Sequence, residues 1–140
     1  MYAYARKNVG PDCPWFGEGS LDEMASGGEG AACTIEEVVD ADDTGIQFAR
    51  WRKHPDLHDW METLAIERGF RGQFNCVWLR LTPQDIDRLQ ADMDEGLARS
   101  GGGFFFGESS PEKEAYTRRF IKGARHAFRK GATIFYDSWW

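Results

Sequence analysis

Three of the five prolines in this chain stand where they predict the beginning of a helix. Proline lacks a backbone N–H and therefore suits the first helical position, where that group would have no partner within the helix. The three are Pro55, Pro83 and Pro111, and apolar residues recur after each of them at intervals of three and four. The chain is therefore predicted to contain three amphipathic helices, whose apolar stripes have to be packed together.

The segments outside these helices include four runs with the composition of β-strands. Residues 1–7 alternate aromatic and small side chains, and the runs at 45–51, 75–81 and 132–140 contain β-branched and aromatic residues. A chain of 140 residues is long enough for one hydrophobic core and too short for two. We therefore predict a single α+β domain over residues 1–140, with a mainly antiparallel sheet packed against about three helices.

Nothing in the sequence resembles a membrane anchor or a secretion signal. Residues 1–7 lack the apolar core of a signal peptide, and no run approaches the roughly 18 consecutive apolar residues that a membrane span requires. Cys13, Cys33 and Cys76 are far apart and form no Cys-x-x-Cys pair, which is typical of free thiols. We expect a soluble, cytoplasmic protein with no cofactor and no membrane partner.

The charges divide the domain into an acidic, glycine-rich arm, residues 8–45, and an aromatic-rich body, residues 46–140. Between Asn8 and Ala49 there are ten acids and no Lys or Arg, so this segment carries −10. The rest of the chain has all 17 basic residues and the other 13 acids, which leaves +4. Duplex DNA is therefore an unfavourable partner for the whole surface.

Most of the arm has the composition of a loop. From Gly10 to Gly30 apolar residues are scarce, and Trp15-Phe16 is the expected point of attachment to the body; a short helix is predicted from about Ile35 to Asp40. Because the arm has acids and no bases, its negative electrostatic field favours encounter with a basic protein surface. The acids predicted to contact a partner are Glu36, Glu37, Asp40, Asp42 and Asp43.

The third predicted helix has a basic outer face. It consists of Arg118, Arg119, Lys122, Arg125, Arg129 and Lys130. Three interpretations stay open. The face is solvated, which is the commonest use of such a face, or it binds the acidic arm of the same molecule, or it binds an anionic partner.

A short cationic cluster precedes the first helix. The free N–H groups of a first helical turn favour an anion, so this junction is a candidate phosphate site. The predicted ligand-binding residues are Arg50, Trp51, Arg52, Lys53, His54 and Phe105. Phe105 belongs to the Phe104–Phe106 run and would stack its ring on the ligand. The alternative is that Trp51 belongs to the core, that the cations are solvated and that His54 caps the helix. Trp51, Trp60, Phe105 and Trp139 are in any case predicted to be largely buried.

His54 and His58 are four residues apart, a spacing that can bind a metal on one face of a helix. Pro55 places His54 outside the helix, and no third ligand is evident, so we predict no metal site. His58 is the one candidate general base, although a structural histidine is the more common outcome. The chain has neither a phosphate-binding loop nor a nucleophile elbow, so covalent catalysis has no support in the sequence.

Several of these segments together resemble a family of small uncharacterised phage and prophage proteins, many of which carry an automatic kinase label. The segments are Arg50-Trp51-Arg52-Lys53, Leu57-His58-Asp59-Trp60, Cys76, Thr82-Pro83, Gly102-Gly103-Phe104-Phe105-Phe106-Gly107 and Ser138-Trp139. The similarity covers roughly residues 46–140 and leaves the arm out. The motifs of a kinase are absent from the sequence, so that label has no support.

The resemblance implies a non-enzymatic phage accessory protein that antagonises a host process. Such a protein would bind a host protein or sequester a nucleotide-like anionic ligand. The alternative is a small hydrolase or transferase acting on a phosphorylated or nucleotide substrate, with His58 as base and Arg52 holding the anion. A third interpretation is a homodimer that forms through the aromatic C-terminal strand.

Overall fold

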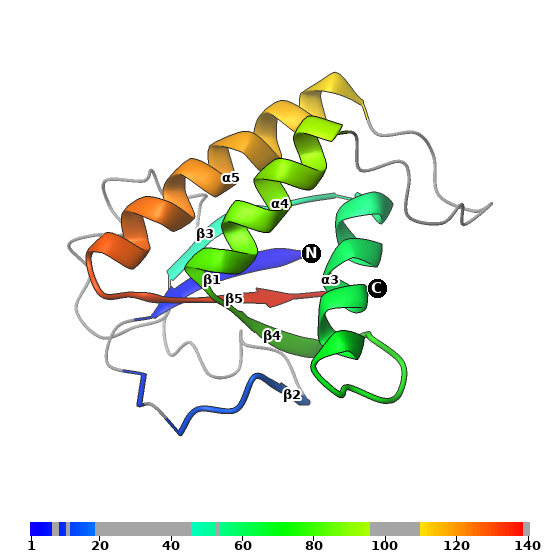
Figure 1. Ribbon diagram of the computed structural model, residues 1–140, viewed down its shortest axis with the longest axis vertical. Helices are drawn as coiled ribbons and strands as arrows, with labels where there is room; N and C mark the ends of the chain where they lie inside the picture. Colours follow the sequence, from blue (N-terminus) through cyan, green and yellow to red (C-terminus); the bar gives the residue numbers. More distant parts are fainter. Residues whose placement is uncertain (7–8, 11, 19–45, 53, 96–109, 139–140) are drawn as a thin grey trace.

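The computed structural model describes residues 1–140 except 7–8, 11, 19–45, 53, 96–109 and 139–140 (Figure 1). Five strands are present: β1 Tyr2–Arg6, β2 Phe16–Glu18, β3 Ile46–Arg50, β4 Val77–Leu81 and β5 Thr133–Asp137. The helices are α3 Pro55–Glu67, α4 Pro83–Glu95 and α5 Pro111–Arg129. The predicted helix of the arm, at residues 35–40, lies outside the described residues.

The strands form one sheet in the order β2-β4-β5-β1-β3, and every neighbouring pair is antiparallel. Residues of all three helices share one buried cluster with residues of the strands, as the position of the helices over the sheet in Figure 1 suggests. The predicted α+β class, with an antiparallel sheet and three helices, is confirmed.

β5 occupies the middle of the sheet, where it pairs with β4 on one side and β1 on the other. A strand that is hydrogen-bonded along both edges cannot pair with a strand of a second molecule. A homodimer through this C-terminal strand would therefore have to use its side chains, and that interpretation stays a prediction. β3 and β2 are the strands at the two edges.

The helices begin at the predicted prolines, and two of them have side-chain caps. Ser110 accepts a hydrogen bond from the Lys113 N–H (3.4 Å), and Thr82 Oγ1 accepts one from the Asp85 N–H (3.2 Å). Asp85 returns the contact by accepting from the Thr82 N–H at 2.6 Å, as in a capping box. His54 occupies the N-cap position of α3, as the alternative expects, but its side chain makes no capping hydrogen bond.

β2 is a strand that the sequence did not predict, because its three residues include a glycine and lie within a loop-like segment. It pairs with β4 so that Gly17 is opposite Trp78, and a Cβ at position 17 would overlap the Trp78 ring. The absence of a side chain at Gly17 is therefore what admits the indole. Phe16 packs against the core, as expected of the attachment point.

A bulge lets β3 contribute two consecutive residues to the core. Ala3 pairs with Ala49 and Tyr4 with Gln47, so Phe48 is the extra residue. Phe48 and Ala49 are both buried in the main cluster. Tyr4, Trp78 and Phe135 form a second, smaller cluster.

The aromatic core is present where the structure describes it. Trp51 and Trp60 are 4% and 6% exposed, which confirms their predicted burial, whereas Phe105 and Trp139 lie outside the described residues. Of the described cysteines, Cys13 and Cys76 are free thiols, and Cys33 is not described. No helix in the described part of the chain is long and apolar enough to cross a bilayer.

Candidate functional site

The cationic cluster before α3 does not converge on one site in the part of it that is described. The Arg50 guanidinium lies 5.8 Å from the centre of the Tyr2 ring, and Arg52 is exposed. Trp51 is in the core, where its Nε1 donates to Thr117 Oγ1 at 3.1 Å. Lys53 and Phe105 lie outside the described residues. The anionic-ligand prediction therefore gains no support from these positions.

His54 is fully buried, and neither of its ring nitrogens has a hydrogen-bond partner among the described residues. Burial lowers the pKa of His54; the charge of Asp56 opposes this shift and that of Lys113 adds to it. The side chain is consequently neutral at pH 7 and presents no cation to an anionic ligand.

His58 links α3 to the middle of the sheet. Its Nδ1 is 3.0 Å from the Tyr136 hydroxyl, and the ring is 7% exposed. Burial is the main cause that lowers the pKa of His58 to about 4; the N-terminal ammonium adds to it, and a backbone hydrogen bond with Phe74 opposes it. Burial also raises the pKa of the Tyr136 hydroxyl. A histidine held and covered in this way lacks the access to substrate that a general base needs.

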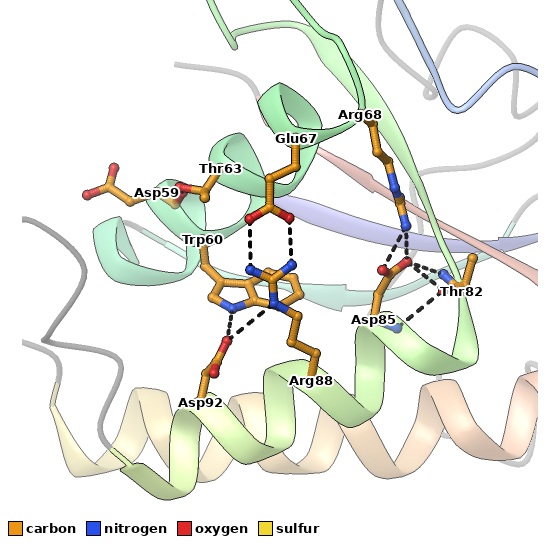
Figure 2. Close-up of polar contacts among 9 residues, drawn as sticks. All are labelled: Asp59, Trp60, Thr63, Glu67, Arg68, Thr82, Asp85, Arg88 and Asp92. Atoms are coloured by element: carbon orange, nitrogen blue, oxygen red, sulfur yellow. Dashed lines mark hydrogen bonds and ion pairs between the residues drawn. The ribbon is translucent and has the colours of Figure 1, made fainter.

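The sequence singled out none of the polar residues that join α3 to α4 in Figure 2 as a site. Arg88 forms two hydrogen bonds with Glu67, at 2.6 and 2.9 Å, and its guanidinium lies 5.8 Å from the Trp60 ring. Trp60 Nε1 donates to Asp92 at 2.7 Å (Figure 2). Every one of these groups is satisfied by another, so the arrangement is a connection between helices.

Arg68 and Asp85 form a second connection next to the first. Arg68 Nη2 donates to both Asp85 oxygens, at 2.7 and 2.6 Å, and its Nη1 donates to the Arg80 carbonyl. The two side chains are only 19% and 9% exposed. Because Asp85 also caps α4, this pair fixes the start of α4 against the end of α3 (Figure 2).

The helices differ sharply in charge. α3 has four acids and no Lys or Arg, and α4 has five acids and one Arg, so each carries −4. α5 has six basic residues and two acids and carries +4. Opposite charges therefore meet where α4 packs beside α5 (Figure 1).

The predicted basic face of α5 consists of two sets of side chains. Arg118 pairs with Asp94 at 2.6 Å, and Arg125 pairs with Asp87 at 2.8 Å, so these two face α4. The other four are exposed and have no ion-pair or hydrogen-bond partner within the described part of the chain; we call them the α5 crest: Arg119, Lys122, Arg129 and Lys130. The crest is a row of cations that nothing in the described body neutralises.

The acids predicted to contact a partner, Glu36, Glu37, Asp40, Asp42 and Asp43, lie outside the described residues. No group of three or more His, Cys, Asp or Glu residues in the described ranges is arranged to hold a metal ion. No protein-family model, no curated protein and no solved structure matches this chain.

Proposed function

We propose that this protein is a non-enzymatic accessory protein of the phage type, which antagonises a host process by binding a host protein. The α5 crest is the observation that carries the proposal. It sets exposed cations, which have no partner among the described residues, along a helix of 19 residues that is buried against the sheet on its other side. A rigid, charged surface of this kind favours association through complementary potentials.

The histidines argue for binding over catalysis. The enzyme alternative assigns the role of base to His58 and the role of anion holder to Arg52. His58 is buried against Tyr136, whereas Arg52 is exposed to solvent, so these two side chains lie in different environments. Residues that act together on one substrate have to be positioned around the same reacting atoms.

Sequestration of a nucleotide-like ligand remains the second form of the proposal. It requires cations and an exposed ring around one ligand. Of the predicted residues that are described, Trp51 lies in the core and His54 is buried and neutral, so they favour a protein partner over a small anion.

Mass spectrometry of the full-length protein purified from its host cell tests this function. The measurement is made under native conditions and then after denaturation, so that protein partners and small ligands are both detected. We expect one host protein in a fixed ratio to this chain, without a bound nucleotide. Detection of a bound nucleotide and no host protein would favour sequestration of a nucleotide-like ligand. Detection of this chain alone would contradict both binding of a host protein and sequestration.

A further inference from the structure

We propose that the α5 crest binds an acidic helix whose carboxylates recur at intervals of seven residues. This inference rests on the proposed binding function and names the chemistry of the partner. It starts from the way in which α5 already binds one acidic helix of this chain, α4.

The contact between α4 and α5 shows which spacing α5 accepts. Asp87 and Asp94 are seven residues apart on α4, and their partners Arg125 and Arg118 are seven residues apart on α5. The pairs run in opposite directions along the two helices, so the helices are antiparallel. Seven residues are about two helical turns, or roughly 10 Å, which returns a side chain to the same side of each helix.

The crest repeats this spacing on the outer side of α5. Lys122 and Arg129 are seven residues apart, and Arg119 precedes Lys122 by three, so the three share one side of the helix. Unlike Arg118 and Arg125, they have no acid opposite them in the described structure. A second acidic helix, placed on the crest as α4 is placed on the inner row, would complete the same pairing.

The observations favour a protein over a single-stranded nucleic acid as the occupant. Proteins that bind single strands generally add exposed aromatic rings to a basic groove, because the bases stack on them. On α5 the aromatic side chains Tyr116, Phe120 and Phe128 are buried or half-buried and pack with the core. The chain as a whole is also negative, at −6, which disfavours nucleic acid.

Two synthetic helical peptides of identical composition test the inference against the full-length protein. One has glutamates every seven residues on one side, and the other has the same glutamates distributed around the helix. Fluorescence anisotropy at low salt measures the two affinities. Because exposed pairs are individually weak, we expect the first peptide to bind only about five-fold more tightly. The double variant Lys122→Gln/Arg129→Gln should lose that preference.

Arg71→Glu is the matched control, since it lowers the net charge by the same two units at an exposed position outside α5. It should keep the preference. Equal affinity of the wild-type protein for the two peptides would contradict recognition of the seven-residue spacing. An unchanged preference in the double variant would show that the crest is not the binding surface. Tighter binding of a single-stranded RNA of equal charge would assign the crest to nucleic acid and overturn the inference.

The two proposals can fail separately. If a host protein is captured equally by the wild-type protein and by the double variant, the binding function stands and the crest is not its surface. If no host protein is captured while the spaced peptide still binds through the crest, the recognition chemistry stands and the proposed function fails.

Discussion

Arginines occur both between α3 and α4 and on the α5 crest, yet the groups that surround them differ. Arg68 and Arg88 each meet a carboxylate from the other helix, and Trp60 donates to Asp92. Lys122 and Arg129 meet no partner in the described body. Residue type alone therefore does not separate a charge that holds the fold from one that is available for binding.

Trp60→Ala should give the largest effect. Trp60 is buried between α3 and α4, so its removal leaves a cavity and also deprives Asp92 of a donor. We expect a loss of about 3–5 kcal/mol in the free energy of unfolding, measured by denaturant titration. Ile66→Ala on the same helix is the control, because Ile66 is 49% exposed and should change little. Similar losses in the two variants would refute a structural role for this connection.

Lowering the pH should destabilise the protein through His58. The pKa of His58 is about 4 in the folded state and near 6.5 in the unfolded state. The contribution of His58 to the free energy of unfolding is therefore complete above pH 6.5 and is lost as the pH falls towards 4. The difference corresponds to about 3 kcal/mol. His54, whose pKa is also lowered, adds to the same trend.

Urea titrations between pH 7 and pH 4 measure this loss. Carboxylates titrate in the same range, so the comparison is with His58→Gln. That variant should be less stable at pH 7 and lose less stability on acidification than the wild-type protein. Parallel curves for the two proteins would show that His58 does not carry the effect.

Asp85→Asn should cost about 2 kcal/mol, because it weakens both the bidentate pair with Arg68 and the cap on Thr82. Asp87→Asn makes the same chemical change two residues further along α4, at a carboxylate that is 68% exposed. That control should cost no more than about 0.5 kcal/mol. If the midpoints of thermal unfolding are equal for the two variants, the buried pair contributes no more than the exposed one.

The smallest effects should come from the two sets of cations on α5. Arg118→Gln/Arg125→Gln removes two exposed ion pairs with α4 and should lower stability by up to about 1 kcal/mol. Lys122→Gln/Arg129→Gln removes the same charge from the crest and should stay within about 0.5 kcal/mol of the parent. Differential scanning calorimetry at low salt compares the two. A larger loss in the crest variant would mean that the crest has a structural role.

The sequence determined the local elements, because their signals lie within a few residues. Pro55, Pro83 and Pro111 begin the three helices, and the apolar stripe of α3, from Leu57 to Ala65, is buried as its spacing predicts. Gly69 and Gly131, where α3 and α5 have ended, adopt φ of +96° and +80°, which glycine tolerates best. The strands other than β2 were visible for the same reason.

Tertiary structure decided everything that depends on which segments meet. β2 is a strand because it pairs with the edge of β4, where the Trp78 ring fills the space beside Gly17 that a side chain would otherwise occupy. The environment of His58 is set by Tyr136, which lies beside it although it is 78 residues away in the sequence. On the basic face of α5, Arg118 and Arg125 are paired because Asp87 and Asp94 lie opposite them. The crest has no such acid opposite it in the described part of the chain. Long-range pairing of this kind has no local signature, since each residue looks the same in sequence whichever partner it finds.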